Sequence, residues 1–387
     1  MGYKSSRIII AGDILPSGNN QELFKSGDAF AVFGEKILYF FHEADFSILN
    51  LEGPLTHSGE GIEKTGPVLK APVDCVRGLK ELGVKALALA NNHITDYGRN
   101  GFEETVGLLV ENGIDYLGAG ELGNIKKSIS LSLGSKRVCI YNVSEEFYNA
   151  ATSSTPGANI YDEYIVCNEI KELKESHDYL IVIYHGGAEE FAYPTPLVRQ
   201  RFHRMADCGA DFITAQHTHC IGCFEEYRGA YLLYGQGNFL FARMKNKITK
   251  QGLVTEILFS DSEVQVKQHV VTVSENDVVR YDENQDLSGF YERSKELADF
   301  SLIEKKYKQF AYNKPSIKDR FLTAYRGESF YYRVINKVAP KYYKRNILEN
   351  YKREQLMRIS KTLSSERYGE DMLAAVDFML EKKKTRL

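Results

Sequence analysis

The chain has 387 residues, of which 43% are hydrophobic and 26% charged, with a formal net charge of −3. These proportions are ordinary for a globular protein, and the absence of any run of 18 apolar residues excludes a membrane-spanning helix. The start "MGYKSSRIIIAGD" lacks the features of a signal peptide. We therefore expect a cytoplasmic protein whose six scattered cysteines are reduced thiols.

Apolar runs in the first 236 residues predict a series of β-strands. Most of these runs are continuous rather than alternating, which indicates strands that are buried on both faces of a sheet. The predicted strands are residues 7–12, 46–52, 84–90, 137–143, 178–184, 211–216 and 230–236.

Helical patterns separate several of these strands. Residues 73–83, 101–113 and 197–209 have apolar side chains at helical spacing, and each segment ends at a glycine, which is a common signal past a helix end. The alternation of strand and helix predicts right-handed βαβ units.

The pattern changes in the last third of the chain. Residues 252–273 alternate apolar and polar side chains around "SDS", which predicts an antiparallel hairpin at the edge of the sheet. Beyond about residue 285 the sequence reads as helical, with breaks at Pro315 and Pro340.

Polar side chains gather where the predicted strands end. Ligands of such sheets bind at the carboxyl ends of the strands, so we expect these side chains to converge. They are Asp13, Asn50, Glu52, Asn91, Asn92, His93, His185, Glu189, His217, His219 and Asn238. That many buried polar groups would be costly without compensation, and one or two divalent cations with oxygen and nitrogen ligands would compensate them. His217 and His219 can reach two adjacent ions if the backbone between them is irregular.

These residues, in this order, resemble the poly-γ-glutamate and capsule synthesis (CapA) family, a branch of the calcineurin-like metallophosphoesterase superfamily. The matching pieces are "GD" (12–13), "ADFSILNLEGPLT" (44–56), "KAP" (70–72), "ALANNHITDYGRNGFEET" (88–105), "GIDYLGAG" (113–120), "HGGAEE" (185–190), "GADFITAQHTH" (209–219) and "YGQGNFLF" (234–241). They cover about the first 60% of the chain. The resemblance implies a four-layer α-β-β-α sandwich, which we assign to residues 1–280. It does not extend over residues 285–387, where the residue pattern alone predicts a helical, basic region.

The resemblance also implies roles for individual residues. It places Asp13 and His219 at a first metal ion, Glu52 as the bridging carboxylate, and Asn92, His185 and His217 at a second ion. It makes His93 the group that stabilises or protonates the leaving oxygen, with Asp96 orienting it. Asn50, Asn91, Glu189 and Asn238 are then partners of the ligands or of the substrate. The implied cofactors are one or two divalent ions, with Mn, Fe or Zn expected.

Four positions depart from the family pattern. Gly186 replaces the Trp of the usual His-Trp-Gly, and Thr218 replaces the Pro of His-Pro-His. Gln216 stands where a further His is common, and Leu15 stands where the wider superfamily has the His of Asp-x-His. The first metal site is therefore either poor in ligands or completed by Asn50 or by water.

Two functions remain open at this point. The first is a metal-dependent hydrolase of phosphate esters that acts in capsule or exopolymer production, on an anionic small molecule or polymer and alongside other capsule-synthesis proteins. In such two-metal hydrolysis, ions roughly 3.5–4 Å apart activate both oxygens of an in-line displacement. The alternative is a non-catalytic member that uses the same pocket to bind the polymer or to assemble the synthesis machinery. Leu15 favours the alternative, whereas the otherwise complete ligand set favours the enzyme.

The C-terminal region differs in charge from the rest of the chain. Residues 285–387 hold 23 Lys and Arg against 14 Asp and Glu, whereas residues 1–284 hold 26 against 38. Within the first of these, residues 326–358 carry nine basic, three acidic and five tyrosine residues. A solvated helical face, attraction to an anionic polymer or lipid-linked precursor, and nucleic-acid binding are all compatible with this composition. The acidic charge of residues 1–284 would repel a long nucleic acid, so we expect no nucleic-acid partner.

Overall fold

The computed structural model describes residues 5–64, 66–145, 149–241, 246–313 and 330–343. The chain forms two compact units, residues 1–307 and 308–387. No helix in the described ranges has both the length and the apolar character that crossing a bilayer requires.

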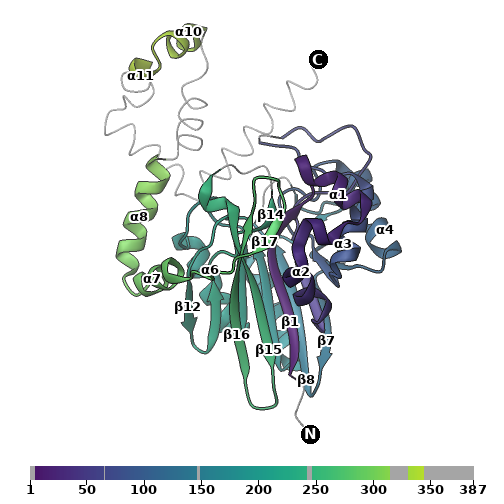
Figure 1. Ribbon diagram of the computed structural model, residues 1–387. Helices are drawn as coiled ribbons and strands as arrows, with labels where there is room; N and C mark the ends of the chain where they lie inside the picture. The colour runs from purple at the N-terminus through teal and green to yellow at the C-terminus, as the bar shows by residue number, and fades with distance from the viewer. Residues whose placement is uncertain (1–4, 65, 146–148, 242–245, 314–329, 344–387) are drawn as a thin grey trace. The chain divides into compact units, whose positions relative to one another are not determined.

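The first unit is built around two large β-sheets. The first sheet has the strand order β17 (Val279–Tyr281), β16 (Val264–Val273), β15 (Gln251–Phe259), β1 (Ser6–Leu15), β2 (Phe46–Leu51), β3 (Ala86–Ala88) and β4 (Asp115–Leu117), and β14 (Asn238–Phe241) also pairs with β1. Strands β1 to β4 run parallel, whereas β15 and β16 form the antiparallel hairpin predicted from residues 252–273 (Figure 1).

The second sheet is parallel at its centre and antiparallel at both edges. Its order is β12 (Phe224–Tyr227), β13 (Ala230–Leu233), β11 (Phe212–Gln216), β10 (Tyr179–His185), β8 (Lys136–Ser144) and β7 (Ser128–Leu133). A small third sheet joins β6 (Asn124–Lys126), β5 (Ala119–Glu121) and β9 (Gly157–Ala158). All seven predicted strands are present, although the run at residues 84–90 is a strand only over its middle.

Three apolar cores show how these sheets are layered. One core lies between the sheets, where Ile8 and Ile48 of the first face Ile140 and Ile181 of the second. The alternate residues of β1, such as Ile9, belong to a different core that includes the helices packed on the first sheet. Those helices are α1 (Gln21–Ser26), α2 (Ala29–His42), α3 (Val76–Leu82) and α4 (Gly98–Glu111).

The outer face of the second sheet is covered in the same way. A third core joins β10 and β11 to α5 (Glu163–Ser176) and α6 (Pro196–Asp207). The layers are therefore helix, sheet, sheet, helix, which confirms the predicted four-layer sandwich. Both sheets are covered on two faces, which explains why their strands read as continuous apolar runs.

Helices follow the hairpin, as the sequence predicted. In the first unit α7 (Ser288–Glu296) packs on β12 through the stacked rings of Phe290 and Phe224. The next helix, α8 (Phe300–Asn313), begins in the first unit and includes the first residues of the second. In the second unit α10 (Phe330–Val338) is followed by α11 (Pro340–Tyr343), which begins at one predicted break. The other predicted break, Pro315, lies outside the described residues.

Candidate metal centre

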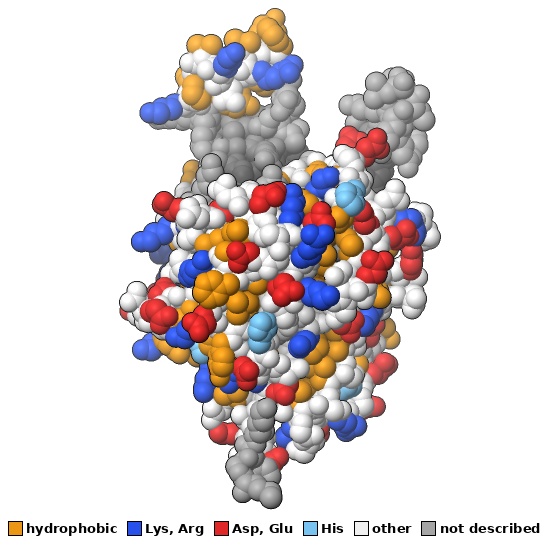
Figure 2. All heavy atoms as spheres, turned by 45° about the vertical axis from the view of Figure 1, so that its right-hand side comes forward, with side chains coloured by type: hydrophobic (Ala, Val, Ile, Leu, Met, Phe, Trp, Pro, Cys, Tyr) orange, Lys and Arg blue, Asp and Glu red, His pale blue; other side chains and the backbone are white. Residues whose placement is uncertain are grey.

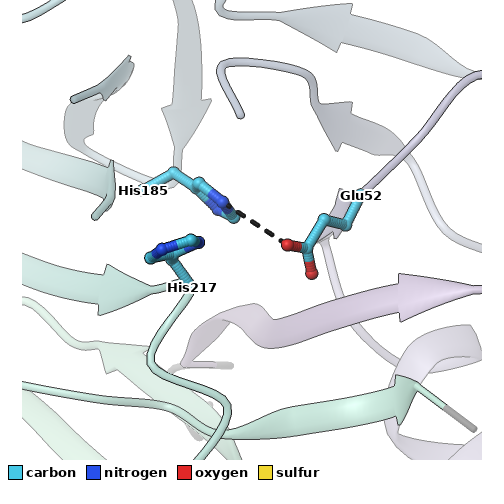
Figure 3. Close-up of side chains that lie close together, drawn as sticks. All are labelled: Glu52, His185 and His217. Carbon is cyan, nitrogen blue, oxygen red and sulfur yellow. Dashed lines mark ion pairs between the residues drawn. The ribbon is translucent and has the colours of Figure 1, made fainter. Parts of the chain in front are cut away.

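Five titratable side chains meet where strands of the two sheets end. Asp13 comes from β1, Glu52 follows β2, His185 ends β10, and His217 and His219 follow β11. All five are buried. The packing of the sheets thus joins carboxylates from the first sheet to imidazoles from the second, and Figure 3 shows Glu52, His185 and His217 pointing toward one another.

The five side chains form two groups with a geometry suited to cations. In one group Glu52, His185 and His217, and in the other Asp13, Glu52 and His219, each offer one ligand atom, and the atoms of a group lie within 4.8 Å of one another. Glu52 belongs to both groups, which is the position of a bridging ligand. The two groups contain five of the six residues for which the resemblance implied metal binding; the sixth is Asn92.

Individual distances show how close these atoms lie. Glu52 Oε1 is 3.7 Å from Nε2 of His185 and also 3.7 Å from Nε2 of His219. Asp13 Oδ2 is 3.3 Å from Nδ1 of His219. One carboxylate oxygen of Glu52 therefore faces imidazoles of both groups.

Glu52 is the clearest indication that a cation belongs here. Its side chain is fully buried, and among the described residues neither carboxylate oxygen has a hydrogen-bond partner. Burial, reinforced by the charge of Asp13, raises the pKa of Glu52 well above its usual range. A buried carboxylate without donors is costly, and a divalent cation supplies the charge that such a group lacks. The residues present therefore fit a metal site.

Two of the three imidazoles have the protonation state that metal ligands need. Burial, together with the neighbouring His219, lowers the pKa of His217 to about 4, and burial and His217 lower the pKa of His185 well below its usual range. Both are neutral at pH 7 and can offer a lone pair. His219 differs, because Glu52 and Asp13 overcome the effect of burial and raise its pKa to about 10. Its positive charge lies between the two carboxylates, where a metal ion would lie.

The local backbone explains how the ligands reach the centre. The pairing of β1 shifts register at Asp13 against both β2 and β14, and such irregularities re-aim side chains. Gly12 is required there, because a Cβ at this position would lie 2.1 Å from the carbonyl oxygen of Gly237. His217 and His219 have φ of 81° and 53°, a region that side-chain-bearing residues rarely adopt. The backbone is therefore irregular at both residues, which is the condition under which the two imidazoles can reach adjacent ions.

Asparagines fix the orientation of the ligands. Nδ2 of Asn50 donates to Asp13 Oδ1 at 2.8 Å, and Oδ1 of Asn50 accepts from Nδ2 of Asn91 at 3.0 Å. Since both ends of the Asn50 amide are engaged, it orients Asp13 rather than offering an oxygen to the first group. Asn92, which is half-buried, places its Oδ1 2.8 Å from Nε2 of His185, so both atoms face the second group.

Two further predicted residues lie at the edge of the centre. Asn238 Oδ1 is 2.8 Å from Nδ1 of His219, while its Nδ2 donates to the carbonyl of Thr249 at 2.7 Å. This arrangement fixes the imidazole ring of His219. Glu189 is exposed, and its charge raises the pKa values of Glu52 and His217.

His93 and Asp96 form a pair beside the centre. Nδ1 of His93 lies 2.7 Å from Asp96 Oδ2, which leaves Nε2 as the ring nitrogen available for a proton. Burial lowers the pKa of His93, although the carboxylate of Asp96 opposes this shift. The backbone amide of Leu69 donates to the same Asp96 oxygen at 2.7 Å.

Lys64 is a site residue that the sequence analysis missed. Its ammonium group forms an ion pair with Asp96 and donates to the carbonyl of Asn92 at 3.2 Å, with only 4% of the side chain exposed. Nothing in "GEGIEKTG" distinguishes this lysine from a solvated loop lysine. Only the folding of the loop over the strand ends buries it.

Packing gives a role to two of the four residues that depart from the family pattern, Leu15 and Gln216. Leu15 is buried in the core between the first sheet and its helices, so position 15 gives the first group no ligand. Gln216 donates from Nε2 to the carbonyl of Ala11 at 3.0 Å and to Gln236 Oε1 at 3.1 Å, and thereby joins the two sheets. All six cysteines are buried and free, including Cys220 and Cys223.

The fold and the centre define a class: a four-layer α/β protein with a buried carboxylate–imidazole site, at the ends of its strands, that is able to hold divalent cations. Residues 7–243 match the family model described as "Bacterial capsule synthesis protein PGA_cap", and the chain belongs to this family.

Relatives with known names agree with this assignment. The chain is 28% identical over 242 residues to the capsule biosynthesis protein CapA of Bacillus anthracis, and 30% identical over 236 residues to the PGA biosynthesis protein CapA of Bacillus subtilis (strain 168). These matches cover 60% and 59% of this chain, and 59% and 62% of the relatives' own lengths. A solved structure described as a novel phosphatase from Mycoplasma pneumoniae aligns over 75% of this chain and all of its own, with 16% identity and a TM-score of 0.43.

Proposed function

We propose that the protein is a metal-dependent hydrolase of phosphate esters that acts in the production of a bacterial capsule or exopolymer. The observation that carries the proposal is Glu52, a buried carboxylate that belongs to two ligand groups and has no hydrogen-bond partner among the described residues. A carboxylate shared by two cations is the central element of a two-metal site.

Each residue of the centre has a part in this proposal. Asp13 and His219 would hold one ion, His185, His217 and Asn92 the other, and Glu52 both. Bound ions would supply Lewis-acid activation of the ester and of the attacking water. His93 would stabilise or protonate the leaving oxygen through Nε2, while Asp96 and Lys64 hold its ring in place.

The donor chemistry suggests the metal and the substrate class. The set contains carboxylate, amide and imidazole groups but no thiolate, which suits Mn, Fe or Zn. The family and the Bacillus relatives are named for the synthesis of capsule and PGA. We therefore propose an anionic phosphate ester linked to polymer synthesis as the substrate.

One observation favours a second function. Leu15 leaves the first group with three side chains, Asp13, Glu52 and His219, and a weakly held first ion would make hydrolysis inefficient. A non-catalytic protein that binds an anionic polymer through one ion would need only the second group.

A metal assay combined with a panel of phosphate mono- and diesters would separate the two functions. The wild type, Glu52→Ala and His217→Ala would be compared with His203→Ala, whose imidazole lies outside the centre and contacts Glu225. The hydrolase requires activity that disappears in the first two variants and persists in the third. Wild-type protein that holds metal but cleaves no ester would overturn the hydrolase and support the binding role.

A further inference from the structure

The second unit presents apolar and basic side chains together on one short helix. In α10 the residues Phe330, Tyr331, Val334 and Val338 are 68%, 76%, 44% and 78% exposed. Positions 330, 334 and 338 are four residues apart and lie along one side of the helix, and 331 lies next to them. These four side chains, which we call the apolar face, are in contact with water.

A row of positive charge runs beside this apolar face. Arg333 and Lys337, again four residues apart, are exposed along its edge, and Lys341 of α11 is exposed beyond the helix end. Residues 330–343 contain no acidic side chain. Figure 2 shows hydrophobic and basic side chains next to one another on this part of the chain.

The opposite side of α10 packs against α11 within the second unit. Tyr332 lies on it, with its ring 6.2 Å from that of Tyr343, which is buried. Backbone bonds from Ala339 to Ile335 and from Tyr343 to Ala339 continue the helical path into α11. The apolar face is therefore the side of α10 that points away from α11.

We propose that α10 is a membrane-surface anchor that lies in the headgroup region of an anionic bilayer. An amphipathic helix with aromatic and aliphatic side chains on one face and Lys and Arg at its edge has the composition of helices that lie in the membrane interface. The apolar face enters the boundary of the acyl chains, and the basic row contacts lipid phosphates.

The combination of charge and apolarity favours an anionic bilayer over a soluble polyanion or a second copy of this chain as the partner of α10. A soluble polyanion would neutralise the basic row but would leave four apolar side chains in water. A second copy packed face to face would bury the apolar side chains but would bring two basic rows together with no acidic side chain between them. An anionic lipid surface would bury the apolar face and also neutralise the basic row.

The test uses the full chain and its lack of tryptophan. Phe330→Trp places one fluorophore on the apolar face, and Tyr164→Trp places one on α5, at a site that is 78% exposed in the first unit. Both variants are mixed with vesicles of phosphatidylcholine alone or of phosphatidylcholine with phosphatidylglycerol. The proposal requires a blue shift of the indole emission of the Phe330→Trp variant with the anionic vesicles, a much weaker one with the neutral vesicles, and none for the Tyr164→Trp control.

Two double variants in the Phe330→Trp background identify the forces. Arg333→Gln with Lys337→Gln should weaken binding about fivefold for each charge removed. Val334→Ser with Val338→Ser should weaken it about tenfold for each side chain. Both pairs are exposed on a surface helix, and an unchanged thermal unfolding curve would show that the chain still folds.

Three results would overturn the proposal. The first is the absence of a shift with anionic vesicles. The second is binding to polyglutamate that depends on the arginine and lysine but not on the valines, which would identify a polyanion site. The third is a blue shift that grows with protein concentration without lipid, which would identify a second copy as the occupant.

Discussion

Two carboxylates of the first unit, the half-buried Glu225 and the fully buried Glu52, have opposite environments. Glu225 on β12 accepts from Nη2 of Arg199 at 2.8 Å, from Nε2 of His203 at 2.5 Å and from the hydroxyl of Tyr234 at 2.6 Å. These bonds overcome burial and lower its pKa below the usual range. Glu52, which is more deeply buried, has no hydrogen-bond partner among the described residues, and its pKa is raised.

The difference shows that the missing partners of Glu52 are a property of its site. This fold can supply donors to a carboxylate that is largely shielded from water, as it does at the half-buried Glu225. Donors are also available near the centre, because the Asn50 amide donates to Asp13 and the His217 backbone amide donates to the same side chain at 3.1 Å. Those donors orient Asp13 and leave Glu52 open. A group that only stabilised the fold would resemble Glu225.

The largest expected effect is on Glu52→Gln. In wild-type protein, metal at a thousandfold excess over its Kd should raise the free energy of unfolding by about 4 kcal/mol. The variant should lose this increment, because an amide cannot bridge two cations. Without metal it should be about 1–3 kcal/mol more stable than the wild type, because the buried carboxylate carries a desolvation penalty.

Thermal and urea unfolding with and without metal would measure both changes. Glu225→Gln is the matched control and should keep the metal increment. A metal-free Glu52→Gln that is less stable than the wild type would show that Glu52 has a structural role like that of Glu225.

The second effect is on Glu225→Gln. The substitution leaves the guanidinium of Arg199 without its charged partner in a largely buried cluster, in which the two side chains are 19% and 14% exposed. We expect a loss of about 2–3 kcal/mol in the free energy of unfolding, with no change in metal content. Urea unfolding and metal analysis of the same preparation would measure it. A change in metal content would link this cluster to the centre and weaken the comparison.

Much of the fold was predictable because its signals are local. The buried parallel strands are continuous apolar runs, and the helix at residues 73–83 ends at Gly83, which has the φ of 82° expected of a left-handed cap. Short strands such as β5, β6 and β9 were not predicted, because two or three residues carry no periodicity. The pairing of β14 with β1 is also a long-range contact that no local pattern reveals.

The centre was predictable to the extent that strand ends carry it. The polar residues at the ends of β1, β2, β10 and β11 were found because topology brings such ends together. Lys64 was missed because it comes from a loop, and its burial depends on how that loop folds. The environment of Glu225 was equally invisible, because Arg199 and Tyr234 come from a helix and a neighbouring strand end.

The third effect concerns His219, an imidazole of the centre whose orientation depends on a neighbouring amide. Asn238→Ala removes the oxygen 2.8 Å from Nδ1 of His219 and so leaves that ring without its fixed orientation. Loss of such a partner typically lowers metal affinity about 10- to 100-fold. The first group should weaken while the second, with His185 and His217, keeps its ion. Titration with metal should then show two steps in the variant, and equal affinities in variant and wild type would contradict the role of Asn238.

The smallest effect is a pH dependence that distinguishes the two carboxylates. Because the pKa of Glu225 is lowered in the folded protein, its contribution to stability is complete above the unfolded value of about 4.3 and is lost as the pH falls through the folded value. The stability difference between wild type and Glu225→Gln should therefore be constant near neutral pH and shrink below about pH 4. Glu52 has the opposite sign, since a raised pKa makes its charge a cost that acid removes. Urea unfolding of the wild type and of Glu225→Gln, from neutral pH to below pH 4, would measure this stability difference. A difference that grew on acidification would mean that the donors do not hold Glu225 as a carboxylate.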